Sequence, residues 1–161
     1  MTKNARPAPG CPQRLDAFAI ASEPGNERVA IARVAQSIAP AGLSGARLER
    51  LKTAVAEAVM NAIEHGNANR ADIPVDVEVT QDGDAVTVSI SDQGGAAPAG
   101  PGQEPDLALK LTGRQSPRGW GLFLIRKMVD AMDVTTEDGR HTVALTMRTS
   151  AAEGADHDEQ V

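Results

Sequence analysis

The chain has 161 residues, a formal net charge of −6 at pH 7 and a sequence pI near 5.0. This length suits one domain, and an acidic chain lacks the basic patch that nucleic-acid-binding domains present. With two Phe, one Trp and no Tyr, few rings are available to stack on bases, so we expect no direct nucleic-acid binding. The single cysteine, Cys11, has no intrachain partner for a disulfide, and no apolar run approaches a bilayer-spanning length. We therefore expect a cytoplasmic protein without a membrane partner.

The first part of the chain predicts a lead, a strand and a helix. Residues 1–12 are polar and rich in Pro and Gly, and we expect a disordered lead. Residues 14–21 alternate imperfectly and indicate an edge strand. Asn26 can cap a helix that runs to about Ala39. The apolar residues expected to face inward from this helix are Val29, Ile31, Ala32, Val34, Ala35 and Ile38.

Residues 51–67 predict one long helix with an apolar stripe at helical spacing. Three polar residues, Glu57, Asn61 and His65, recur every four positions, so their side chains share one strip of this helix. A Glu carboxylate can take a proton from a nucleophile. The amide oxygen of Asn is a suitable ligand for Mg²⁺, which completes its shell with phosphates and water. The alternative reading is an ordinary solvated helix face.

The second half of the chain predicts two hairpins separated by a long loop and a helix. Residues 75–80 and 86–91 alternate apolar and polar side chains, which predicts two half-buried strands joined by a turn. Residues 96–118 form a long connection, which inside a compact domain is usually either functional, such as a lid, or disordered. A helix is expected over residues 122–132, followed by a hairpin with its turn at Asp138 and Gly139. Residues 150–161 indicate an acidic disordered tail.

The motif Asp92-x-Gly94 follows the second strand of the first hairpin. A buried carboxylate there can accept a hydrogen bond from an exocyclic amine, and Gly94 lets the backbone come close to a flat ring. The alternative is an ordinary turn at the end of a strand.

A second glycine motif, Gly119-x-Gly121, directly precedes the helix expected from Leu122. It offers bare backbone N–H groups and the positive end of a helix dipole to a phosphate, and Arg118 supplies a cation nearby. The alternative is a glycine-rich helix cap without a ligand.

Taken together and in this order, the motifs Glu57-x-x-x-Asn61, Asp92-x-Gly94 and Gly119-x-Gly121-Leu122 resemble the N, G1 and G2 boxes of the GHKL (Bergerat-fold) ATP-binding superfamily. The resemblance covers about residues 15–148. Residues 56–66 (AEAVMNAIEHG) and 118–126 (RGWGLFLIR) look most like the anti-sigma factor serine/threonine kinases of the RsbW/SpoIIAB type.

The resemblance implies an α+β two-layer sandwich, a mixed and mostly antiparallel sheet with three helices on one face. It implies a domain over residues 13–149 that binds ATP and Mg²⁺ beneath a lid at 96–118. In that family pattern Asn61 matches the Mg²⁺ ligand, Glu57 the base that activates a hydroxyl, and Asp92 the acceptor of the adenine amine. The other nucleotide-contact positions are Gly94, Arg118, Gly119, Gly121 and Leu122.

The implied function is a kinase that phosphorylates a STAS-domain anti-sigma factor antagonist and sequesters a sigma factor, commonly as a homodimer. Glu57 favours this reading, because a module that only binds nucleotide needs Asn61 and the glycines but no base. The alternative is a nucleotide-dependent binding module with little or no phosphoryl transfer.

Overall fold

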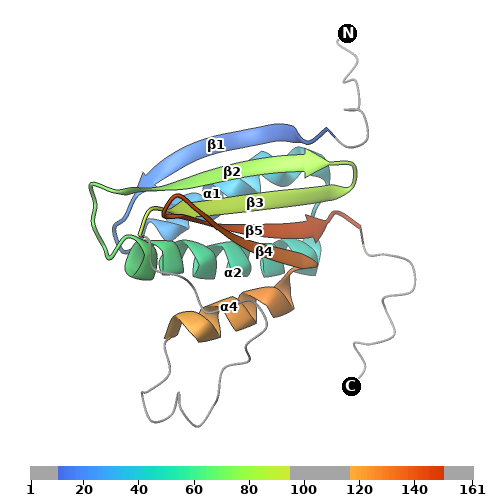
Figure 1. Ribbon diagram of the computed structural model, residues 1–161. Coiled ribbons are helices and arrows are strands. Elements are labelled where there is room, and N and C mark those ends of the chain that lie inside the picture. Colours follow the sequence, from blue (N-terminus) through green and yellow to red (C-terminus); the bar gives the residue numbers. More distant parts are fainter. Residues whose placement is uncertain (1–10, 95–116, 151–161) are drawn as a thin grey trace.

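The computed structural model describes residues 11–94 and 117–150. In this part of the chain, three helices cover one face of a five-stranded sheet (Figure 1). No helix in these ranges is long and apolar enough to cross a membrane. The helices and strands are β1 (Gln13–Ala21), α1 (Glu27–Ile38), α2 (Gly45–Asn61), β2 (Pro74–Asp82), β3 (Ala85–Asp92), α4 (Pro117–Met128), β4 (Ala131–Glu137) and β5 (Arg140–Arg148).

The sheet has the strand order β1-β2-β3-β5-β4, and each neighbouring pair is antiparallel. Both predicted hairpins form. The turn between β4 and β5 places Asp138 at φ 51° and Gly139 at φ 78°, as a two-residue type I′ turn requires. The predicted two-layer α+β sandwich is confirmed, and the alternation of apolar residues located β2 and β3 to within two residues.

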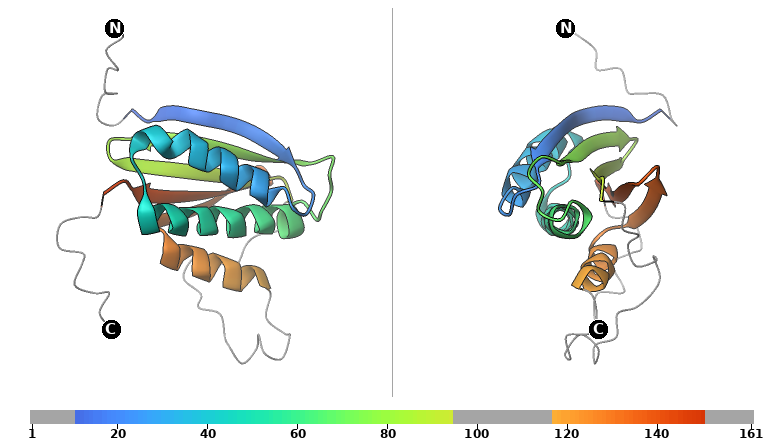
Figure 2. Two further views of the ribbon diagram at one scale, coloured as in Figure 1. Left: turned by 180° about the vertical axis from the view of Figure 1, so that it is seen from behind. Right: turned by 60° about the vertical axis from the view of Figure 1, so that its left-hand side comes forward.

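The core lies between the sheet and the helices. Val77, Val88 and Leu145 are buried on the helix-facing side of three neighbouring strands, opposite the buried Leu51 and Val55 of α2. Helix α2 is the central helix of its layer, with α1 and α4 packed against it (Figure 2). The other face of the sheet carries no helix of the described chain, as expected from its Asp, Glu, Ser and Thr residues.

Helix α1 differs from the prediction in the side that it buries. Its inward residues are Ala30, Val34 and Ile38, whereas Val29 is 54% exposed. These three recur every four residues, so they lie on one stripe, and Val29 falls outside it. Asn26 precedes the helix without capping it; its side-chain amide instead donates to the Ala21 carbonyl at 2.8 Å.

Helix α2 begins at Gly45, and its expected last turn is not α-helical. Residues Ala62–Gly66 form a π-helical turn, closed by a hydrogen bond from the Asn67 N–H to the Ala62 carbonyl at 2.8 Å. The wider turn changes the angular spacing after Asn61, so His65 does not continue the regular strip. Single π turns of this kind often occur at functional sites.

Helix α4 spans Pro117–Met128 rather than the predicted 122–132. Gly119 and Gly121 therefore lie inside its first turns instead of preceding it. Pro at the first helical position favours this start, because its fixed φ suits a helix and its missing N–H would have no partner there. The predicted lead, lid and tail fall mostly or wholly on residues 1–10, 95–116 and 151–161, outside the described residues.

Candidate functional site

The buried polar side chains of the described residues gather at one end of the sheet. At this end β1 and β3 finish and β2 and β5 start, at the left in Figure 1. The C-terminal end of α2 and the N-terminal end of α4 lie on the same side. The buried polar residues are Ser22, Asn67, Ser91, Asp92 and His141. Burial of polar groups is costly unless each finds a partner, so their concentration marks this end as the candidate site.

Asp92 and two glycines form the tightest contact at this end. A Cβ atom built on Gly66 would lie 2.2 Å from the Asp92 Cγ, and one built on Gly94 would lie 1.3 Å from the Gly66 carbonyl oxygen. At Gly94 only glycine fits without a shift of the backbone, and at Gly66 a Cβ would displace the Asp92 carboxylate. The Asp92 carboxylate, 4% exposed, accepts a hydrogen bond from the Gly94 N–H at 3.1 Å. The end of α2 and the end of β3 thus meet backbone to backbone.

Asn67 ties this contact to the rest of the sheet. Its side-chain oxygen accepts from the Gln93 N–H at 2.9 Å, and its Nδ2 donates to Ser22 Oγ at 2.9 Å and to the Pro74 carbonyl at 3.2 Å. The side chain is 1% exposed. Sequence reasoning placed Asn67 at the end of a helix and the start of a polar loop, and missed this role. A signal was present, since an Asn directly after a helix-ending Gly often serves the local backbone.

Of the polar strip predicted on α2, Glu57 and Asn61 share one face of the helix, whereas His65 lies in the π-helical turn. Asn61 Nδ2 is buried and has no hydrogen-bond partner among the described residues. Glu57, one turn earlier, is half-buried and forms no ion pair or hydrogen bond within that part of the chain. An uncommitted amide and an uncommitted carboxylate on one helix face can both serve a ligand that lies across α2.

The donor set fits a hard divalent cation that brings most of its own ligands. Within residues 11–94 and 117–150, no group of three or more His, Cys, Asp or Glu side chains is arranged to hold a metal. A cation at Asn61 would therefore take its other ligands from phosphates and water, as Mg²⁺ does in nucleotide sites.

Helix α4 brings the second glycine motif to the edge of α2. Leu122 is 7% exposed and belongs to the core, where it fixes α4 against α2. The backbone of Gly119 and Gly121 lies in the first turns of α4, whose N-terminal end carries unpaired N–H groups. Arg118 lies in the same turn, and its side chain is outside what the structure describes.

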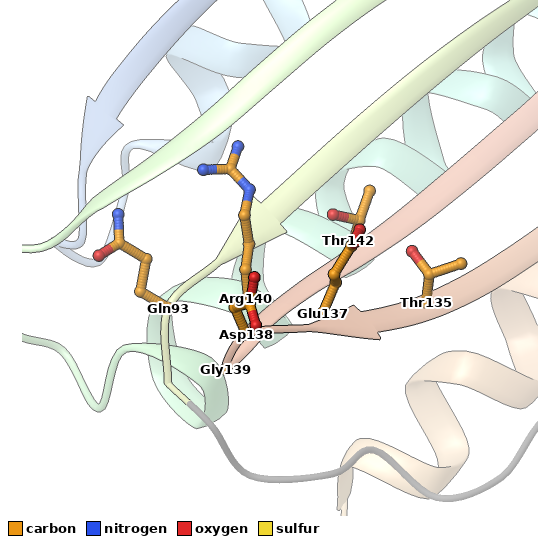
Figure 3. Close-up of a pocket in the computed structure, with 7 residues that line it drawn as sticks. All are labelled: Gln93, Thr135, Glu137, Asp138, Gly139, Arg140 and Thr142. Carbon is orange, nitrogen blue, oxygen red and sulfur yellow. The ribbon is translucent and has the colours of Figure 1, made fainter.

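A separate hollow of about 520 Å³ opens at the same end of the molecule (Figure 3). Thr135 and Thr142 line it, and they pair across β4 and β5 in the register that points away from the helices. Asp92 and His141 pair in the opposite phase and face the helices. The hollow therefore lies on the open face of the sheet and is distinct from the glycine contact. The lining residues are Gln93, Thr135, Glu137, Asp138, Gly139, Arg140 and Thr142.

Comparisons with known proteins agree with this arrangement. Residues 20–147 match the sequence family described as "Histidine kinase-like ATPase domain". The chain is 35% identical over 120 residues to the "Anti-sigma F factor" of Clostridium beijerinckii, covering 73% of this chain and 82% of that protein. A crystal structure of the RsbU and RsbW domains of Rv1364c from Mycobacterium tuberculosis has the same fold, with a TM-score of 0.59 and 23% identity over 88% of this chain. The matched region is 33% of that longer chain. The chain belongs to the GHKL family of histidine kinase-like ATPase domains, among the anti-sigma factor proteins of the RsbW and SpoIIAB type.

Proposed function

We propose that this protein is an anti-sigma factor that binds ATP with Mg²⁺ and phosphorylates a serine or threonine of an antagonist protein. The observation that carries the proposal is the pairing of an uncommitted Glu57 with an uncommitted Asn61 on α2, beside the glycine contact at Asp92. A plain structural helix would commit or solvate these groups, whereas a phosphoryl-transfer site needs both.

The nucleotide is held by three segments. The Asp92 carboxylate, held in place by the close packing of Gly66 and Gly94, accepts a hydrogen bond from the adenine amine. The first turn of α4, with Gly119 and Gly121, offers N–H groups to the phosphates, where Arg118 adds a positive charge. Asn61 supplies a neutral oxygen to Mg²⁺, which neutralises charge on the phosphates when it is bound.

The transfer step places the acceptor hydroxyl near Glu57. Glu57 accepts the proton as the hydroxyl oxygen forms a bond to the γ-phosphorus, and the bond from that phosphorus to the bridging oxygen breaks to release ADP. Because Glu57 makes no ion pair within the described chain, its carboxylate is not held away from this role.

The proposed partners are the ones that the family resemblance suggests. The phospho-acceptor is a STAS-domain antagonist, and the protein sequesters a sigma factor as a homodimer. Both the antagonist and the sigma factor are proteins, so recognition uses surface of this chain beyond the nucleotide site.

The test measures transfer from labelled ATP to candidate antagonists. Glu57→Gln keeps the size of the side chain and removes the base, so transfer should fall about 10²- to 10⁴-fold while ATP affinity stays within a few-fold. Glu64→Gln is the matched control, since Glu64 is exposed near the same helix end and should behave as wild type. Glu57→Gln with wild-type transfer would show that the base assignment is wrong.

Asn61→Ala separates metal binding from transfer. It should remove the Mg²⁺ dependence of ATP binding, which calorimetry with and without Mg²⁺ detects. If the wild type binds Mg²⁺ and ATP but transfers no phosphate to any antagonist and still captures a sigma factor, the chain is a nucleotide-dependent binding module instead.

A further inference from the structure

His141 is a buried polar residue at this end to which no role has yet been assigned. It is the second residue of β5 and pairs directly with Asp92 across the β3–β5 ladder, so the two side chains lie next to each other on the helix-facing side of the sheet. The residue is 1% exposed. Its Nδ1 lies 3.1 Å from Thr136 Oγ1 on β4, while Nε2 is buried without a hydrogen-bond partner among the described residues.

The unpartnered Nε2 is not an ordinary feature of a core histidine. A buried polar atom without a partner costs roughly 1–3 kcal/mol, and such atoms are rare in folded proteins. In the described part of the chain, only two buried side-chain nitrogens lack a partner, Asn61 Nδ2 and His141 Nε2. Both lie at the end of the sheet that carries Asp92, one on α2 and the other on β5. The unpartnered His141 Nε2 at this end is therefore available to a ligand.

We propose that His141 Nε2 donates a hydrogen bond to the nucleobase, next to the amine whose hydrogen bond Asp92 accepts. The two residues together then select adenine. The inference rests on the proposed function, because it requires ATP to bind at Asp92. The edge of adenine presents an amine, N6, next to a ring acceptor, N1. Asp92 can only accept and a protonated Nε2 can donate, so the adjacent pair matches that edge.

The same pair rejects guanine. The corresponding edge of guanine presents an oxygen where adenine has its amine, and an N–H where adenine has N1. Asp92 would face the oxygen and His141 would face the N–H, so an acceptor would meet an acceptor and a donor would meet a donor. Sites built on such complementarity discriminate strongly between analogues.

Thr136 acts as a positioning residue for this contact. When the Thr136 hydroxyl donates to Nδ1, Nε2 carries an imidazole proton and can donate to the base. Thr136→Val keeps the shape of the side chain but removes this hydroxyl. The imidazole proton is then no longer held on Nε2, so the contact with the base weakens although residue 136 does not touch the nucleotide.

The experiment compares ATP with 1-deaza-ATP, in which a C–H replaces N1, by calorimetry of the full chain with Mg²⁺. Wild type should bind ATP about 2- to 12-fold more tightly, the range for one neutral hydrogen bond. His141→Leu should bind both nucleotides equally, and Thr136→Val should reduce the ratio. His141→Gln, whose amide can donate from a similar place, should keep part of it.

Two results overturn the proposal: a wild type that binds ATP and 1-deaza-ATP equally, or a His141→Leu variant that keeps the wild-type ratio. The wild-type comparison needs no variant, so a His141→Leu protein that fails to fold does not obscure it. A wild type that binds neither nucleotide refutes the proposed function itself. Equal affinity for ATP and 1-deaza-ATP refutes only the role of His141.

Discussion

Replacement of Asn67 by Ala tests whether the sheet holds the nucleotide end in place. The change removes the acceptor of the Gln93 N–H, which lies between Asp92 and Gly94, and the donor to Ser22 Oγ and the Pro74 carbonyl. Each hydrogen bond contributes about 0.5–1.5 kcal/mol net, and groups left unpaired in a buried place cost more. Because the Gln93 N–H is only partly buried, we expect a total loss of about 2–3 kcal/mol in the free energy of unfolding.

Urea denaturation measures this loss, and a thermal scan should show a midpoint lower by about 5–10 °C for a chain of this length. Nucleotide affinity should also fall, by roughly tenfold or more, because a displaced Gln93 carries Asp92 and Gly94 away from their positions. Calorimetry at a temperature where the variant is fully folded separates the two effects.

Ser22→Ala is the matched control. The Ser22 hydroxyl donates to the Ile73 carbonyl at 2.5 Å and accepts from Asn67, so its loss should cost about 1 kcal/mol of stability. The bond from Gln93 to Asn67 remains, and nucleotide affinity should stay within about twofold. Equal losses of affinity in the two variants, or an Asn67→Ala variant as stable as wild type, would refute the reasoning.

Two further predictions concern the glycine contact and a surface ion pair. Gly94→Ala should abolish nucleotide binding, because its Cβ would lie 1.3 Å from the Gly66 carbonyl oxygen. The control, Gly83→Ala, is strained at φ 60° but lies in open space. It should cost about 1–2 kcal/mol of stability and leave the nucleotide affinity measured by calorimetry unchanged. A hydrogen bond from Arg33 holds the pKa of Asp16 below its ordinary value. Wild type should therefore be more stable than Asp16→Asn above about pH 4, and urea denaturation should show the difference disappear as the pH falls through the lowered pKa; a difference that persists at pH 2 would contradict this cause.

The sequence predicted the parts of the fold that depend on local patterns. The alternation in β2 and β3 and the Asp138-Gly139 turn are local signals, and each led to the correct element. The start of α4 was missed because Gly119 and Gly121 have low helix propensity, which suggested that they precede the helix. Packing of α4 against α2 outweighs that propensity.

The site was predictable where its residues share one element and not where several segments converge. Glu57 and Asn61 were recognised as candidates because one helix spaces them. Asn67 gains its role from Ser22, Pro74 and Gln93, which lie in three other segments. His141 reads as an ordinary strand residue until the register of β3 and β5 places it beside Asp92. Such long-range juxtapositions leave no periodicity in the sequence.

The central claim is that the end of the sheet around Asp92 binds ATP with Mg²⁺, and calorimetry with wild type and Asp92→Asn tests it most directly. Wild type should bind one nucleotide per chain. Asp92→Asn, with its fold verified by thermal unfolding, should bind about 10- to 100-fold more weakly, since a hydrogen bond to a charged group contributes about 1.5–3 kcal/mol. A wild type that shows no heat of binding, or an Asp92→Asn variant that binds as tightly as wild type, would contradict the account.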